Sequence, residues 1–142
     1  MKLNLAHATS IANASIVKAR ELGTSVSVAV CNTEGRIIVF FKMDGTDAMS
    51  GHEAMRRAIG AAGSGAPGRS GRGTMEDRRS TRTSTVENEG MGCSYRPGGL
   101  SLKLAGEDFG AIGVCGDTGA EQDVECARAG TVAFGELRAA AS

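Results

Sequence analysis

The stretch "SVSVAVCNTEGRIIVFFKMDG" (residues 25–45) decides the fold of this chain. Val26, Val28 and Val30 alternate with Ser and Ala, which is the period of a strand, and the "RIIVFF" that follows is a stronger apolar run. The polar residues 33–35 between the two runs end in glycine and are typical of a turn. We therefore predict two antiparallel strands joined by a short turn.

Helices are predicted on both sides of this hairpin. Apolar residues recur at helical spacing over residues 4–22, and Asn4 is placed to cap the start. Ser50 and Glu53 form a capping-box pattern, in which the hydroxyl and the carboxylate each satisfy an amide at a helix start. This pattern predicts a second helix from about residue 51 to 62.

The rest of the chain alternates between glycine-rich, polar and apolar segments. Residues 60–73 hold six glycines and are predicted to form a mobile loop, and residues 74–88 are polar without an apolar stripe. The apolar runs at residues 100–106 and 108–116 predict a second hairpin, and Thr118 opens a final helix with apolar residues at three- to four-residue spacing.

Composition limits the class of protein. The 142 residues fit a single domain spanning residues 1–142, and 41% apolar residues are typical of a globular chain. The 16 basic and 16 acidic residues cancel, and there is no Trp and one Tyr, which argues against nucleic acid and membrane surfaces as partners. The N-terminus lacks the apolar core of a signal peptide, so we expect a cytoplasmic protein. Four cysteines without a CxxC pair predict no metal site.

Several segments resemble the GlcG/HbpS-like family, which is also found as the C-terminal domain of PduO proteins. They are "KARELGTSVSVAVCNTEGRIIVFFKMDG", "EAMRRAIGAA", "GGLSLK" and "GAIGVCGDTGAEQDVECARAG", in the expected order. The resemblance implies an α+β, roadblock- or profilin-like fold, with a mostly antiparallel sheet of about five strands packed with N- and C-terminal helices. It also implies homo-oligomers and, as family ligands, haem, corrinoid or small organic acids.

Arginines cluster in the middle of the chain. Half of all basic residues are the eight arginines Arg56, Arg57, Arg69, Arg72, Arg78, Arg79, Arg82 and Arg96. Guanidinium groups hold carboxylates through paired hydrogen bonds, so the cluster indicates an anionic ligand. A solvated basic face or an ion-paired oligomer interface explains the same cluster equally simply.

Two residues are candidates for moving a proton. Glu87, beside Glu89, follows the Thr-rich run and would serve as a base if burial raised its pKa; a solvated loop carboxylate is the alternative. His52 lies in the first turn of the second helix, where the dipole disfavours its protonated form; an exposed polar helix start is the alternative. Cys115 faces the start of the last helix as a candidate thiol or a small buried residue.

The predicted ligand contacts come from arginine, hydroxyl and glycine positions. Arg57 and Arg82 are the carboxylate clamps, and the helix start at Thr118 offers amides to an anion. The remaining candidates in the ligand-binding set are Thr83, Gly98 and Gly99.

Three functions remain open at this point. The leading one is a cytoplasmic homo-oligomer that binds or transforms a small anionic organic acid, by deamination, tautomerisation or decarboxylation of an unsaturated dicarboxylate. The second is a haem- or corrinoid-binding module with a sensory or storage role. The third is an assembly subunit whose arginines only hold protomers together. The Ala- and Gly-rich stretch "AIGAAG" (residues 58–63) predicts apolar surface covered by a partner subunit, so we expect at least a dimer.

Overall fold

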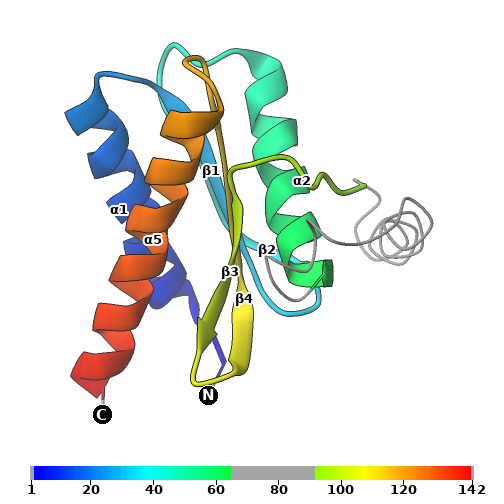
Figure 1. The fold of residues 1–142 in the computed structure, drawn as a ribbon, viewed down its shortest axis with the longest axis vertical. Coiled ribbons are helices and arrows are strands. Elements are labelled where there is room, and N and C mark those ends of the chain that lie inside the picture. The colour runs from blue at the N-terminus through cyan, green and yellow to red at the C-terminus, as the bar shows by residue number, and fades with distance from the viewer. Residues whose placement is uncertain (1, 65–91, 142) are drawn as a thin grey trace.

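The computed structural model describes residues 2–64 and 92–141. In chain order the elements are α1 (Leu5–Leu22), β1 (Val26–Cys31), β2 (Ile37–Lys42), α2 (Ala48–Ser64), β3 (Gly99–Leu104), β4 (Glu107–Gly116) and α5 (Ala120–Ala141). Figure 1 shows three layers, with α1 and α5 on one face of the sheet and α2 on the other. The predicted α+β fold with N- and C-terminal helices against an antiparallel sheet is confirmed.

The sheet has four strands in the described part of the chain, one fewer than the five expected. Their order is β2-β1-β4-β3, and every neighbouring pair is antiparallel. Residues 92–98, which precede β3, add no strand and contact α2 instead: the Ser94 amide donates to the Arg56 carbonyl at 2.9 Å. This detour places residues 92–98 beside the candidate site described below.

The first hairpin forms as predicted. Val30 pairs with Val39, and the side-chain oxygen of Asn32 accepts from the amides of Glu34 and Arg36 at 2.9 and 3.0 Å. These two bonds satisfy turn amides that the strands leave unpaired. All six residues of β1 are buried, because helices cover both faces of this strand. The Ser and Ala residues of β1 therefore face a second core on the other side of the sheet, whereas the alternation of Val with Ser and Ala had suggested a core on one side only.

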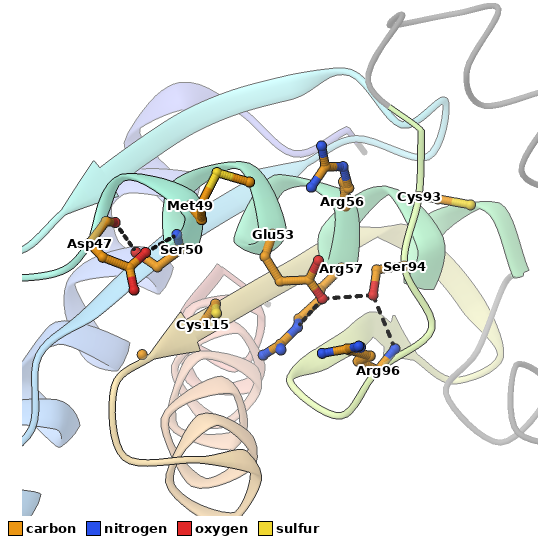
Figure 2. A pocket seen from close by; sticks show the side chains of 11 residues that line it. Asp47, Met49, Ser50, Glu53, Arg56, Arg57, Cys93, Ser94, Arg96 and Cys115 are labelled. Carbon is orange, nitrogen blue, oxygen red and sulfur yellow. Dashed lines mark hydrogen bonds and ion pairs between the residues drawn. The ribbon is translucent and has the colours of Figure 1, made fainter.

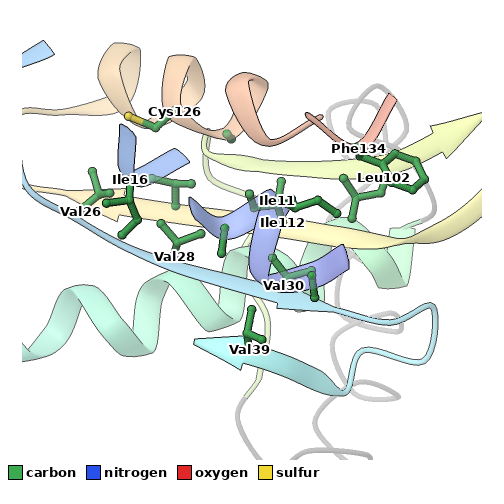
Figure 3. Packing of buried hydrophobic residues seen from close by; sticks show 14 of the residues in the cluster. Ile11, Ile16, Val26, Val28, Val30, Val39, Leu102, Ile112, Cys126 and Phe134 are labelled. Carbon is green, nitrogen blue, oxygen red and sulfur yellow. The ribbon is translucent and has the colours of Figure 1, made fainter. Parts of the chain in front are cut away.

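The two faces of the sheet carry different cores. Val26, Val28 and Val30 pack with Ile11, Ile112 and other apolar residues between the sheet and the α1/α5 layer, as Figure 3 shows. On the opposite face, Ala29 and Cys31 meet a smaller set of residues under α2: Ala58, Ala61 and Ala111, with Ile37, Met55 and Ala62 partly buried. The small side chains let α2 lie close to the strands.

A glycine in β4 sets how closely α2 approaches. A Cβ on Gly113 would collide with the Ala54 carbonyl oxygen and the Ala58 amide nitrogen of α2. Because nothing larger than hydrogen fits there, the backbone of β4 touches the backbone of α2. The end of β4 and the first half of α2 consequently form one continuous surface.

The start of α1 agrees with the sequence, whereas the starts of α2 and α5 differ: the last helix begins at Ala120, and the Thr118 hydroxyl, expected at its start, bonds to that of Thr24. Asn4 caps α1 as predicted, accepting from the His7 amide at 2.8 Å. The Ser50/Glu53 capping box is wrong: α2 begins at Ala48, and Asp47 accepts from the Ser50 amide at 2.9 Å. The Ser50 hydroxyl bonds instead to Ser27 at 2.9 Å, because Ser27 is buried in β1 and needs a partner.

The far end of α2 also extends beyond its predicted limit. The helix continues to Ser64, so residues 60–64 are helical where we expected the mobile loop to begin. Gly60 is tolerated because a Cβ there would collide with the Ser94 carbonyl oxygen, and this contact offsets the low helix propensity of glycine. The remainder of the predicted loop lies outside the described residues.

The surface differs from the expectation in one respect. Ala58, Ile59 and Ala61 of the "AIGAAG" stretch are buried inside the chain, so these three residues provide no apolar surface for a partner. Large apolar side chains are exposed instead on the outer helices, at Leu5, Val17 and Val132, on α2 at Met49, on β2 at Phe40 and at the end of α1 at Leu22. Within residues 2–64 and 92–141, no helix has the length and apolar character needed to cross a membrane.

Candidate functional site

A cavity of about 440 Å³ lies where the first half of α2, the end of β4 and residues 93–96 meet. Charged and sulfur-containing side chains dominate its wall, as Figure 2 shows. We call it the Arg57 cavity. Its lining residues are Asp47, Met49, Ser50, Glu53, Arg56, Arg57, Cys93, Ser94, Arg96, Cys115 and Gly116.

Arg57 forms the centre of the wall and joins three elements. Its Nε donates to Glu53 Oε2 at 2.8 Å within α2, and its Nη1 donates both to the Val114 carbonyl of β4 at 2.7 Å and to Asp123 Oδ2 of α5 at 2.8 Å. Only 7% of the residue is exposed. Burial by itself would lower the pKa of this guanidinium, but the hydrogen bonds to Asp123 and Glu53 outweigh it and raise the pKa. The group is permanently charged.

Asp123 anchors Arg57 from behind. It lies in the first turn of α5, is 2% exposed, and its Oδ1 accepts from the Gly116 amide at 2.9 Å. Burial raises the pKa of this carboxyl, while the bond to Arg57 opposes the rise. The carboxylate thereby ties α5 to the end of β4, and it orients the Arg57 side chain.

Glu53, Ser94 and Arg96 form the outer part of the same network. The Ser94 hydroxyl donates to Glu53 Oε2 at 2.8 Å, and it accepts from the Arg96 amide at 3.3 Å. Glu53 Oε2 therefore accepts two hydrogen bonds, one from Ser94 and one from Arg57. These contacts hold residues 94–96 against α2, with Arg96 exposed at the rim.

Gly98 and Gly99 lie behind Arg57 and leave room for it. A Cβ on Gly98 would approach Arg57 Nη1 to 2.9 Å, and one on Gly99 would approach the Arg57 carbonyl oxygen to 2.5 Å. Gly98 also has φ +115°, a backbone conformation that favours glycine. Neither glycine lines the cavity, although both were predicted to contact a ligand. The structure gives them a packing role.

Cys115 is the half-buried thiol of the cavity. Burial raises its pKa, and the nearby positive charge of Arg57 opposes the rise without reversing it. The thiol is therefore protonated at neutral pH, and of the two alternatives for Cys115 this favours the small buried residue. It offers the cavity a neutral, polarisable surface.

Two further predicted site residues, His52 and Thr118, do not line the cavity. His52 is exposed on α2 and is not among the lining residues. Thr118 lies in the β4–α5 connection, and its hydroxyl is 2.9 Å from that of Thr24. The remaining candidates Arg82, Thr83 and Glu87 fall outside the described residues. Of the predicted catalytic residues and ligand contacts, Arg57 is thus the one that the described structure places in the cavity wall, together with the candidate thiol Cys115 and with Arg56 and Arg96 of the arginine cluster.

The sequence did not lead us to predict Glu53, Ser94 and Asp123 as residues of the site. Glu53 precedes Arg57 by four residues, which is the spacing of an ion pair on one helix face, and this signal was available. Asp123 resembles an ordinary acidic residue in the first turn of a helix. Its bond to an arginine 66 positions away depends on the three-layer packing and has no local signal.

Several solved structures share this fold. Klebsiella pneumoniae protein ORFY is 22% identical, with a TM-score of 0.76 over 95% of this chain and 92% of that chain. HbpS of Streptomyces reticuli, as a double mutant, is 29% identical, with a TM-score of 0.74 over 93% of this chain and 86% of that one. PduOC in complex with heme is 20% identical, with a TM-score of 0.75 over 94% and 95% of the two chains.

A comparison with curated protein sequences found no match. The family model described as "Haem degrading protein HbpS-like" matches residues 3–131, which include every strand, helices α1 and α2, and the first half of α5. It also spans the complete lining of the Arg57 cavity. This chain belongs to the HbpS-like family of haem degrading proteins.

Proposed function

We propose that this HbpS-like protein binds a small molecule carrying a carboxylate in the Arg57 cavity. The observation that carries the proposal is the guanidinium of Arg57, which is held rigidly and almost fully buried at the base of an open cavity. Its Nε and Nη1 are occupied, and its Nη2 has no hydrogen-bond partner among the described residues. A buried, oriented guanidinium with free donors favours a carboxylate.

Arg96 supports the same proposal from the rim. It is exposed and lines the same cavity, and its backbone is fixed by the bond to Ser94. A ligand between the two arginines would meet one rigid donor at the base and one adaptable donor at the mouth.

The transformation of an unsaturated dicarboxylate, with Glu87 or His52 moving the proton, remains a prediction of the sequence.

Haem is the second candidate ligand. The family description names haem degradation, and one structure of similar fold is a heme complex. The described lining fits a buried haem poorly, because a haem pocket needs apolar walls and this one presents five charged side chains. Burying those charges against the apolar ring would cost free energy, which pairing of arginines with the two haem propionates would offset only in part. We therefore propose a small carboxylate, rather than haem, as the first candidate ligand of the Arg57 cavity.

A thermal-shift screen of monocarboxylates, dicarboxylates, amino acids and hemin tests the proposal. A ligand at 100 times its dissociation constant stabilises the native state by about 2.7 kcal/mol, which is readily measured. We expect a carboxylate to raise the melting temperature of the wild type, and Arg96→Gln to abolish the shift. Arg36→Gln, an exposed arginine in the β1–β2 turn, is the matched control.

Each other outcome of the screen contradicts the proposal. A shift that survives Arg96→Gln would place the ligand elsewhere. Saturating binding of hemin at one per chain, with no response to any carboxylate, would establish the haem reading instead. No response to any compound would favour the assembly subunit.

A further inference from the structure

The Arg57 cavity presents an acceptor and a donor side by side. Glu53 uses only Oε2 for its bonds to Arg57 and Ser94, and its Oε1 has no hydrogen-bond partner among the described residues. The Glu53 side chain is 21% exposed and that of Arg57 8%, so both are within reach of the cavity. Figure 2 shows the two side chains converging at its centre.

The planar guanidinium fixes how the free groups are arranged. The Nε–H and one N–H of Nη2 lie along the same edge of this group, in the fork geometry that matches a carboxylate. Nε points at Glu53 Oε2 from 2.8 Å, so the free Nη2 donor is directed to the same side of Arg57 as Glu53. A ligand bound there meets a free donor and a free carboxylate oxygen within a short distance of each other.

The charges of the described site cancel. Three arginines line the cavity with two carboxylates, Asp47 and Glu53, and the Asp123 carboxylate behind Arg57 balances the third arginine. A dianion would bring a second negative charge towards Glu53 and Asp47, and like charges at close range are unfavourable. A molecule whose own charges cancel, with a carboxylate and a cation close together, meets no such cost.

Resting on the proposed function, we propose that the ligand is an α-amino acid rather than a dicarboxylate. Its carboxylate accepts from Arg57 Nη2 and Arg96, and its ammonium donates to Glu53 Oε1, with Asp47 on the same side of the cavity. The adjacency of ammonium and carboxylate in an α-amino acid matches the adjacency of Glu53 and Arg57. Met49, which is exposed at the cavity wall, offers an apolar contact to the side chain of the ligand.

Calorimetry with three compounds of one carbon skeleton tests the inference: pentanoate, 2-aminopentanoate and pentanedioate. 2-Aminopentanoate adds an ammonium at C2 of pentanoate, and pentanedioate has a carboxylate in place of the terminal methyl group. We expect 2-aminopentanoate to bind at least tenfold more tightly than pentanoate, which corresponds to about 1.4 kcal/mol, and pentanedioate to bind no more tightly than pentanoate.

Two charge-removing variants assign the effect to its residues. Glu53→Gln keeps an oxygen for Arg57 and Ser94, and Asp47→Asn keeps a good helix cap, so each removes charge with little change in structure. We expect Glu53→Gln to reduce the preference for 2-aminopentanoate over pentanoate at least fivefold. If Glu53→Gln does not fold, Asp47→Asn should still reduce the preference, by a smaller factor.

The outcomes separate this inference from the proposed function. Equal affinity for pentanoate and 2-aminopentanoate, or tighter binding of pentanedioate, would overturn the amino-acid assignment and leave carboxylate binding intact. A preference that neither Glu53→Gln nor Asp47→Asn reduces would also overturn it. Failure of all three compounds to bind would overturn the proposed function together with this inference.

Discussion

Replacing Asp123 by alanine should destabilise the fold more than any substitution on the surface. Asp123 is 2% exposed and accepts hydrogen bonds from Arg57 at 2.8 Å and from the Gly116 amide at 2.9 Å. Removing it leaves a buried guanidinium with Glu53 as its remaining ionic partner. Removing one partner of a buried ion pair typically lowers the free energy of unfolding by about 3–5 kcal/mol.

The expected loss lies at the lower end of that range. Glu53 stays in place and compensates part of the Arg57 charge, so we expect Asp123→Ala to lower the free energy of unfolding by about 3 kcal/mol. Urea denaturation, with the midpoint and the slope fitted separately, measures this loss. Asp117→Ala removes an exposed carboxylate from the same β4–α5 connection, and this control should stay within about 0.5 kcal/mol of the wild type.

A double variant tests the cause. If the loss arises from an uncompensated buried charge, the double variant Arg57→Met/Asp123→Ala should lose less free energy of unfolding than the two single variants lose together. We expect the difference to be about 1–3 kcal/mol. Additive losses would show that the two residues act independently. A loss below about 1 kcal/mol for Asp123→Ala would refute the reasoning itself, since such a value is ordinary for any substitution.

Four further predictions concern packing and the thiols. Gly113→Ala should destabilise by about 1–3 kcal/mol in urea, because the new Cβ collides with the α2 backbone. Gly135→Ala, where nothing lies within 4 Å in α5, should stabilise by about 0.5–1 kcal/mol. Burial, with nearby acidic groups, raises the pKa of Cys126 from 9.0 to about 11, so the native state holds this proton while the unfolded chain loses it. Stability should therefore fall as pH rises from about 9 to 11, and Cys126→Ala should lose less stability over this range than the wild type. The raised pKa of Cys115 predicts that the native thiol reacts with iodoacetamide more slowly at pH 7.5 than the unfolded chain does; a faster native rate at the site, measured by mass spectrometry of the labelled peptide, would contradict it.

The helices and strands of the fold could be predicted from the sequence because the patterns that indicate them are local. The hairpin of β1 and β2 follows from apolar alternation and a turn within one short segment, and the start of α1 follows from an asparagine next to its own helix. The start of α2 was misplaced by a few residues because Ser50 and Glu53 form a pattern that is locally complete. The structure differs because Ser50 bonds to Ser27 of β1, which is a tertiary contact, and Glu53 bonds to Arg57 four residues further along the same helix.

The sequence by itself determined that the chain is α+β, which segments are strands and helices, and that arginine chemistry gathers near α2. Only the tertiary structure decided which arginine is held rigidly in a cavity and by what. Arg57 depends on Asp123, which is 66 positions away, and on Gly98, and these meet because β4 brings α2 and α5 together from opposite faces of the sheet. Residues this far apart in sequence carry no joint periodicity. Their contact is set by how the layers pack, which is a property of the whole chain.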